Sequence, residues 1–231
     1  MFGPCFLPAS QETVKHVAVA VGHPNRSPHF HAVILYRDSS GAVHGLDINL
    51  AGIISSTPLG MPTAAFAWAV PDFDDDVLEQ VASFCESVGK EPRHLTYAFE
   101  IGSSSQLAKR GDHFVAIGSD GFTCATLVLA IFQSLLVPLI DLASWHMRQE
   151  DTDWQKEVIA LMKKLRDRKK MQVTDAHLEA LEKQLPCIRY SPHIVIGACR
   201  VGGHPSHCQP SYEAGHECLR WLEQSITMRA T

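Results

Sequence analysis

The feature that most constrains this chain of 231 residues is a cysteine at the boundary between a tight turn and a strongly apolar segment. The turn, Gly118–Gly121, contains two glycines that can adopt positive φ. The segment from Ala125 to Leu136 is mostly apolar, and its length and composition predict a buried helix. Cys124 is therefore expected near the first turn of this helix, just after a tight loop.

This position favours a reactive thiol at Cys124. At a helix N-terminus the backbone N–H groups lack intrahelical partners, and the positive end of the macrodipole stabilises an anion. A thiolate is such an anion, so we expect a lowered pKa for Cys124, as a nucleophile requires. The alternative is a buried structural cysteine, which is a common environment for this residue type. A base close to Cys124 would favour the first interpretation.

Composition and charge exclude several classes of protein. The apolar fraction of 45% supports a core without help from disulfides. The formal net charge of −5 predicts neither a nucleic-acid partner nor an anionic membrane partner. The seven cysteines are scattered and Met1–Pro4 lacks the features of a secretory signal, so we expect free thiols and a cytoplasmic location. Pro138 and Asp141 interrupt the apolar stretch Phe122–Ala143, which predicts a buried helix rather than an integral membrane segment.

Turn signals and periodicity predict the order of the elements. A β-hairpin is expected from His29–Arg37 and Ala42–Ile48 around the turn Asp38–Gly41. An amphipathic helix is expected over Asp72–Gly89, and a loop bordering a cleft over Asn49–Ala65. The other expected strands are Val14–Val21, Arg93–Ile101, His113–Ile117 and His193–Gly197, and the other expected helices are Thr152–Lys170, Thr174–Gln184 and Ser211–Ser225.

Together these elements predict an α+β fold, in which a central antiparallel sheet packs against the helix that carries Cys124. Residues 1–150 would form the core of the domain. Residues 151–231 would form a helical elaboration with a final strand and helix, packed on the same domain. The pattern does not indicate an oligomeric state.

Two histidines of the hairpin are candidates for the base that Cys124 needs. Strand pairing about the turn is expected to place His31 close to His44. If the sheet packs on the cysteine helix, the three side chains can form a Cys–His–His site. Cys124 would be the nucleophile, His31 the general base and then acid, and His44 the group that orients His31. The backbone N–H of Cys124 would contribute to an oxyanion hole.

Within this site two assignments stay open. His29 is two residues from His31 and on the same strand face, so it is an alternative base. Asp47 or Asn49 could orient the base in place of His44. Neither assignment requires a metal or a cofactor.

A second candidate site lies near the C-terminus, where thiols and imidazoles follow one another at short spacings. Its members are Cys199, His204, His207, Cys208, His216, Glu217 and Cys218. Such groups in a loop rich in glycine and proline can hold zinc tetrahedrally. The spacing lacks a C-x-x-C pair, so it is not that of a standard finger or ribbon, and a loop before the last helix is the alternative.

The hairpin motif His31-x4-Tyr36 followed by Gly41–Ala42–Val43–His44 resembles the catalytic-histidine hairpin of papain-like hydrolases of the NlpC-like superfamily. The order, with histidine before cysteine, is similar to the circularly permuted branch, which includes lecithin:retinol acyltransferase-like enzymes and related bacterial peptidases and amidases. The resemblance implies a papain-like fold in permuted order and a cysteine-dependent hydrolase. The sequence Thr123–Cys124–Ala125–Thr126 differs from the Asn-Cys-Glu-His type of motif of the acyltransferase-like members, and no carboxy-terminal membrane anchor is visible. Both differences favour a peptidase or amidase.

The expected function is therefore hydrolysis of an amide, peptide or isopeptide bond through a thioester acyl-enzyme. A peptide, peptidoglycan or a protein would be the substrate. One alternative is a lipid acyltransferase or phospholipase that uses the same site. Another is a non-catalytic binding module whose C-terminal cysteines and histidines hold zinc.

Overall fold

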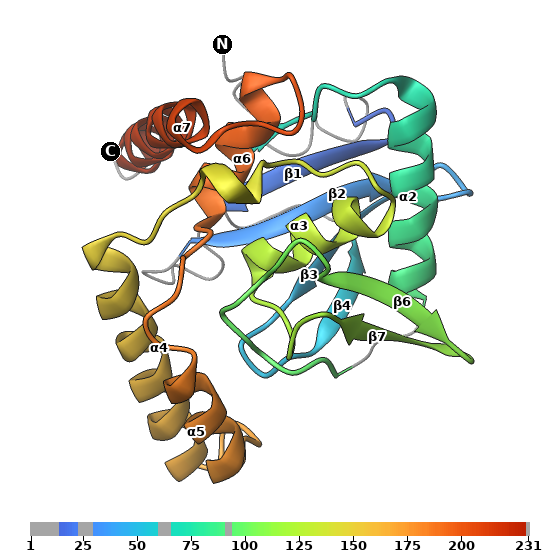
Figure 1. Cartoon of the computed structure of the whole chain (residues 1–231). Coiled ribbons are helices and arrows are strands. Elements are labelled where there is room, and N and C mark those ends of the chain that lie inside the picture. The colour runs from blue at the N-terminus through green and yellow to red at the C-terminus, as the bar shows by residue number, and fades with distance from the viewer. Residues whose placement is uncertain (1–13, 23–29, 60–65, 91–93, 230–231) are drawn as a thin grey trace.

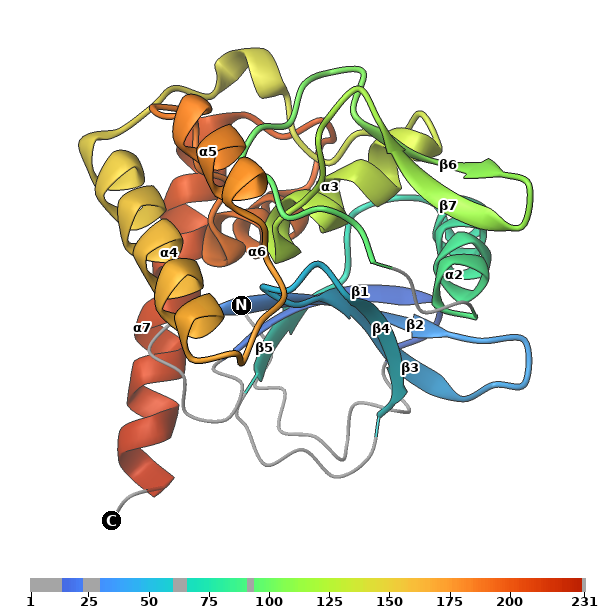
Figure 2. The same ribbon diagram turned by 90° about the horizontal axis from the view of Figure 1, so that it is seen from below.

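The computed structural model describes residues 14–22, 30–59, 66–90 and 94–229, except for the side chains of Phe66 and of residues 225–229. The main sheet has the strands β1 (Val17–Gly22), β2 (His31–Arg37), β3 (Val43–Ile48), β4 (Ile54–Pro58) and β5 (Phe66–Ala69). They pair antiparallel in the order β4-β3-β2-β1-β5. Helices gather on one face of this sheet (Figures 1 and 2). The architecture is thus α+β with an antiparallel central sheet, as predicted.

The predicted hairpin is confirmed as β2 and β3. In its turn, the Gly41 N–H donates to the Asp38 carbonyl at 3.0 Å, and the Asp38 N–H donates to the Ala42 carbonyl at 2.8 Å. Arg37 therefore lies opposite Val43, and the register of all following pairs is set from this point. Since side chains alternate between the two faces of a strand, this register decides which polar groups meet.

Two expectations for irregular and extended segments are wrong. The predicted loop Asn49–Ala65 contains β4, which continues the meander, while residues 60–65 lie outside the described part of the chain. The predicted strand Arg93–Ile101 has only an isolated bridge between His94 and Ile53 over its described residues. It is held by single hydrogen bonds to separate segments, such as the 2.7 Å bond from the Leu95 N–H to the Gly52 carbonyl, rather than by a ladder.

The helix expected after the tight turn is confirmed as α3 (Cys124–Ser134). All its residues from 125 to 133 are buried, because α3 packs on β2 and β3 and is covered on its other sides. Its neighbours include α2 (Asp75–Gly89) and a two-stranded sheet of β6 (Gln106–Arg110) and β7 (His113–Ile117). Among the described residues, no helix has both the length and the hydropathy needed to cross a membrane.

The C-terminal part consists of η2 (Leu142–Ser144), α4 (Gln149–Asp167), α5 (Asp175–Lys183), α6 (Pro192–Val201) and α7 (Cys208–Arg229). The predicted final strand His193–Gly197 is wrong, because these residues lie in α6. A short run of β-branched residues does not distinguish a strand from a buried helix. Here Pro192 occupies the first turn, where its fixed φ suits a helix. Gly197 then allows α6 to pack closely against Gly215 of α7.

The buried side chains form more than one cluster. The largest joins the sheet, α2, α3, α6 and α7. A second cluster is built by α4 and α5 together with Tyr97 and Phe99, from the irregular segment before β6. The helices α6 and α7 therefore share the core of the sheet, whereas α4 and α5 have a core of their own.

Replacement of Gly197 by alanine is expected to destabilise the fold. A Cβ atom there would lie 2.1 Å from the Ser211 carbonyl oxygen and 2.6 Å from the Gly215 nitrogen, and these backbone atoms cannot move without separating the two helices. We expect a loss of about 1–3 kcal/mol in the free energy of unfolding, measured by urea denaturation. Val201→Ala, at an exposed position of the same helix, is the control and should change this energy by less than about 0.5 kcal/mol. An equal response of both variants would contradict the close helix packing.

Candidate active site

The tight loop before α3 fixes the position of Cys124. Gly121 has a φ of +155°, and a Cβ there would lie 1.7 Å from the Thr96 carbonyl oxygen, so only glycine fits. The Phe122 N–H donates to the same oxygen at 3.0 Å. Thr123 caps α3, since its Oγ1 accepts from the Thr126 N–H at 3.1 Å and the Thr126 Oγ1 accepts from the Thr123 N–H at 2.7 Å. Cys124 is thus the first residue of α3, as predicted, and its side chain is partly exposed.

His31, at the first position of β2, connects Cys124 to a carboxylate. Its side chain hydrogen-bonds with the Cys124 thiol, and its Nε2 lies 2.8 Å from Asp47 Oδ2. Because Nε2 faces the carboxylate, Nδ1 is the nitrogen left for the thiol. The other carboxylate oxygen, Asp47 Oδ1, accepts from the Ser55 hydroxyl at 2.6 Å. Cys124, His31 and Asp47 therefore form a continuous chain, which Ser55 of β4 supports.

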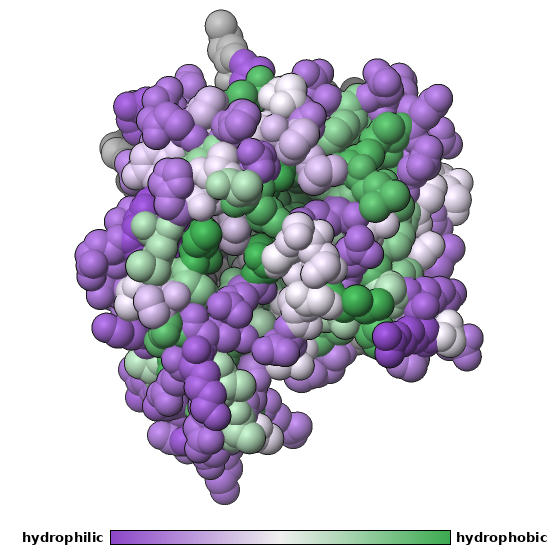
Figure 3. Space-filling view, in the orientation of Figure 1, coloured by the Kyte–Doolittle hydropathy of each residue, from purple (hydrophilic) through white to green (hydrophobic). Residues whose placement is uncertain are grey.

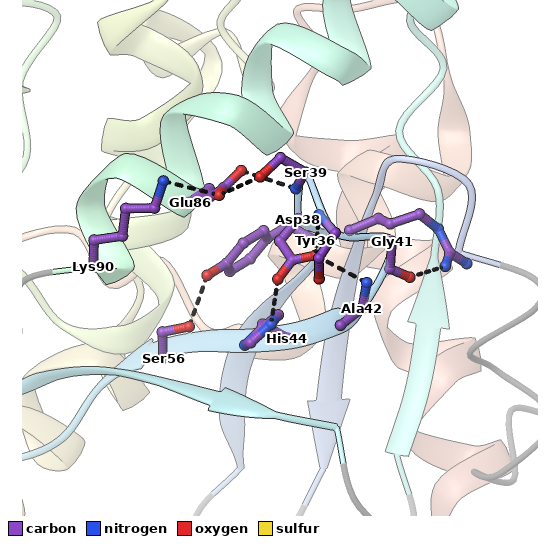
Figure 4. A network of polar contacts seen from close by, with 11 residues as sticks. Tyr36, Asp38, Ser39, Gly41, Ala42, His44, Ser56, Glu86 and Lys90 are labelled. Atoms are coloured by element: carbon purple, nitrogen blue, oxygen red, sulfur yellow. Dashed lines mark hydrogen bonds and ion pairs between the residues drawn. The ribbon is translucent and has the colours of Figure 1, made fainter.

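The expected pairing of His31 with His44 is wrong. In the observed register His44 lies opposite Tyr36, close to the turn, whereas His31 is at the far end of β2. His44 Nε2 instead contacts Asp38 Oδ2 at 2.9 Å, and its ring stacks on Tyr36 with a centroid distance of 5.4 Å (Figure 4). Asp47 takes the place expected for His44 because it lies three residues further along β3, toward the end that carries His31.

The network around His44 has a structural role. Tyr36 Oη and Ser56 Oγ are 2.7 Å apart, which ties β2 to β4 across β3 (Figure 4). The turn is tied to α2, because the Ser39 N–H and hydroxyl both donate to the Glu86 carboxylate, at 3.0 and 2.9 Å. These contacts fix the hairpin at the end opposite to Cys124.

Of the two remaining alternatives, the structure places Asn49. Asn49 Oδ1 accepts from the N–H groups of Ala51 and Ile53, at 2.9 and 3.1 Å, so its side chain stabilises the turn between β3 and β4. Asn49 is therefore not the partner of His31, which contacts Asp47. His29, the alternative base, lies outside the described residues.

The electrostatics of Cys124 and His31 favour an ion pair. Burial alone would raise the pKa of the Cys124 thiol, but the charge and hydrogen bond of His31 and the N–H groups of Ala32 and Ala125 outweigh it and lower that pKa. Burial alone would lower the pKa of His31, but Cys124 and Asp47 outweigh it and raise that pKa. Each group therefore favours the charged form of the other, a thiolate beside an imidazolium. By contrast, burial raises the pKa of Cys85, which has no such partner.

The surroundings of the site include groups that the sequence pattern did not indicate. Tyr97 is buried, and its hydroxyl pKa is raised first by burial and then by the nearby Cys124 charge. It also lines a cavity of about 230 Å³ between the β3–β4 turn and the helices α4 and α5, together with Met162, Met171 and His177. Figure 3 shows apolar residues, in green, around hollows near the centre of the face that Figure 1 presents.

The C-terminal cysteines and histidines do not assemble into a metal site. These six residues and Glu217 lie in the part of the chain that the structure describes, and the described residues contain no group of three that could hold a metal ion. Cys199 and Cys218 are buried in the apolar core shared by α6 and α7. His204 Nε2 accepts from the Asp72 N–H at 3.2 Å, and its Nδ1 lies 3.1 Å from the Leu139 carbonyl oxygen. The expectation of a zinc-holding module is therefore not supported by the geometry.

Comparisons of the chain with models of protein families, with curated proteins and with solved structures found no match. The function proposed below therefore depends on the geometry of Cys124, His31 and Asp47 and on the resemblance of the hairpin motif.

The lowered pKa of Cys124 predicts an unusual pH dependence of alkylation. An ordinary thiol has a pKa of about 8.5, so its alkylation rate falls about tenfold for each pH unit below that value. A group with a lowered pKa stays ionised to a lower pH, and we expect the rate at Cys124 to fall less steeply from pH 8 to pH 6.5 than that of an ordinary thiol. Cys208 is the internal control, because it is partly exposed and burial raises its pKa. Site-resolved mass spectrometry measures both rates, and parallel profiles at the two residues would contradict the ion pair.

Proposed function

We propose that this protein is a cysteine-dependent hydrolase that cleaves an amide, peptide or isopeptide bond through a thioester acyl-enzyme. The observation that carries this proposal is the chain of contacts from the Cys124 thiol through His31 to the Asp47 carboxylate. A nucleophile, a base and a group that orients the base are the three components that such catalysis needs.

In the first half of the reaction, the Cys124 thiolate attacks the carbonyl carbon and forms a tetrahedral intermediate. The Cys124 N–H, at the N-terminus of α3, donates to the oxyanion. As the intermediate collapses, the C–N bond breaks and the His31 imidazolium gives its proton to the departing amine. The products of this half are a thioester on Cys124, a neutral His31 and a free amine.

In the second half, water attacks the thioester while the neutral His31 takes a proton from it. The C–S bond then breaks, the carboxylic acid is released, and the thiolate and the imidazolium are restored. Asp47 stays ionised throughout, because its pKa is lowered: burial alone would raise it, but the hydrogen bonds from His31 and Ser55 outweigh that effect. Its role is to hold the His31 ring in one orientation and one tautomer.

We further propose that the fold is a papain-like arrangement in permuted order. The support is that the strand with the histidine precedes the helix with the cysteine in the chain, and that the helix N-terminus and the start of the strand meet at the site. The carboxylate in the third position distinguishes the site from the Cys–His–His pattern expected from the sequence.

The proposal is tested by incubating the protein with a quenched-fluorescent peptide library, with peptidoglycan stem peptides and with isopeptide-linked peptides. We expect turnover of at least one amide class, its loss in Cys124→Ala, and a Cys124-linked acyl group that hydroxylamine releases. Stable protein without reaction of Cys124 toward any electrophile would contradict the proposal. Turnover of phospholipid vesicles, with none of any amide, would instead indicate lipid acyl chemistry at the same site.

A further inference from the structure

The cavity between the β3–β4 turn and the helices α4 and α5 has a volume of about 230 Å³, and much of its lining is apolar. The apolar lining residues come from three separate parts of the chain: Leu50, Ala51, Tyr97, Met162, Met171 and Val173. Tyr97 and Met162 are almost fully buried. Leu50, Met171 and Val173 are only partly buried and pack against the second core cluster. The cavity therefore presents apolar surface that the rest of the described chain does not cover.

Hydrogen bonds connect the wall of this cavity to the loop that carries Cys124. The carbonyl oxygen of Thr96, a lining residue, accepts from the Phe122 N–H at 3.0 Å. Phe122 precedes Cys124 by two residues and consecutive Cα atoms are about 3.8 Å apart, so this oxygen lies within about 12 Å of the Cys124 Cα. The Leu95 N–H donates to the Gly52 carbonyl at 2.7 Å, which holds the same segment against the β3–β4 turn. The cavity is thus within reach of a side chain one or two residues away from a carbonyl group held at Cys124.

The lining selects an uncharged group. Among the described residues that line the cavity there is no Asp, Glu, Lys or Arg, so a charged group would lose its hydration there without gaining an ion pair. By contrast, Glu100 and Asp120 line a separate cavity of about 760 Å³, which Gly118 also lines. The smaller cavity therefore suits an apolar occupant, and the larger one does not.

The size of the smaller cavity limits the occupant further. Pockets that hold a drug-sized ligand have volumes of about 300–1,000 Å³. A cavity of about 230 Å³ suits one side chain better than a whole ligand or a long acyl chain. Met162 and Met171 are flexible and polarizable, so this wall can adapt to side chains of different shape.

An imidazole of the lining can bind the peptide group next to such a side chain. Burial and then the charge of His94 lower the pKa of His177, and the charge of Asp120 opposes this effect. His177 is therefore uncharged at physiological pH, which keeps its part of the lining neutral. A neutral imidazole has one donor and one acceptor nitrogen, so His177 can hydrogen-bond with a peptide N–H or carbonyl group.

We propose that this cavity binds a large apolar side chain of a peptide substrate, one or two residues away from the carbonyl group that Cys124 attacks. This inference rests on the proposed function and names its substrate class. The free energy gained grows with the apolar area removed from water, so a leucine or phenylalanine side chain binds better than a small one. The helices α4 and α5 then take part in the selection of the substrate.

The test uses N-acetyl dipeptide aldehydes, which protect Cys124 from iodoacetamide. When the thiolate adds to the aldehyde, an S–C bond forms, the C=O double bond becomes single, and the oxygen takes the His31 proton. One residue of each probe is glycine, and the other is glycine, leucine, phenylalanine or lysine, in both orders. Site-resolved mass spectrometry gives the probe concentration that halves the alkylation rate of Cys124. We expect leucine at one position to lower this concentration about tenfold or more relative to glycine, and lysine to bring little gain.

Two variants change the size of the cavity in opposite directions. Val173→Phe fills it and should reduce the preference for leucine over glycine to about twofold or less. Met171→Ala enlarges it and should shift the preference from leucine toward phenylalanine, which provides a test even if Val173→Phe folds poorly. Val201→Phe and Met147→Ala, at exposed positions, are the matched controls and should keep the preference of the wild type.

Equal protection of the wild type by the leucine and glycine probes would overturn the inference. An undiminished leucine preference in folded Val173→Phe would also overturn it, as would an equal loss in Val201→Phe. Decanal has an aliphatic chain without peptide groups, and stronger protection by decanal than by every dipeptide would overturn the peptide assignment in favour of a lipid acyl chain. A wild-type Cys124 that reacts with neither iodoacetamide nor any aldehyde would instead contradict the proposed hydrolase.

Discussion

Replacement of His31 by alanine is expected to reduce the alkylation rate of Cys124 at pH 6.5 by about 100-fold. Without the imidazolium, burial is the largest remaining influence on the thiol and raises its pKa toward or above that of an ordinary thiol. At pH 6.5 such a thiol is only about 1% ionised. Mass spectrometry measures the alkylation rate at each cysteine, and Cys208 is the internal reference.

His44→Ala is the matched control for this experiment. It removes an imidazole from the same hairpin, but from the end that contacts Asp38. In His44→Ala the alkylation rate of Cys124 should stay within about twofold of the wild type. The free energy of unfolding should fall by about 1 kcal/mol, because a hydrogen bond is lost. If both variants lose the same reactivity, the effect comes from the hairpin as a whole and not from His31.

Replacement of Asp47 by asparagine is expected to lower kcat by about 10²–10⁴ on any substrate that the protein turns over. An amide can present its N–H₂ group to His31 Nε2, which would stabilise the wrong tautomer of the base. The carboxylate also favours the imidazolium, so the same variant should weaken the low-pH reactivity of Cys124.

Asp38→Asn provides the comparison for Asp47→Asn, because Asp38 forms the equivalent contact with His44. The kcat of Asp38→Asn should remain near that of the wild type. In the observed register Asp38 and His44 lie near the turn of the hairpin and do not contact Cys124. A large loss of kcat in Asp38→Asn with no loss in Asp47→Asn would restore the expectation that His44 supports the base.

Much of the site's location could be predicted from the sequence, because the relevant signals are local. The glycine turn and the apolar run fix Cys124 at a helix start, and the Asp38–Gly41 turn fixes the hairpin. The orienting group could not be fixed in the same way. In an antiparallel pair, residues that are near in sequence to the turn pair near the turn, and a residue at the end of β2 meets the far end of β3. His44 is too close to the turn, and Asp47 is not.

Other features could not be predicted because they depend on distant contacts. The run His193–Gly197 has the composition of a strand, and only its packing against α7 through Gly197 and Gly215 makes it a helix. The contact of the Arg189 guanidinium with the Trp154 ring likewise joins residues that are far apart in the sequence.

The separate core of α4 and α5 implies that the molecule does not lose its structure in one step. Local opening is cheapest where an element shares few buried contacts with the rest, and these two helices bury their apolar side chains mainly against each other and against Tyr97 and Phe99. Trp154, on which Arg189 is stacked, belongs to this smaller unit, whereas Cys124 and His31 are held by α3 and the main sheet. As denaturant is added, α4 and α5 are then expected to open before Cys124 and His31 separate, so that the two parts of the fold have different thresholds of stability.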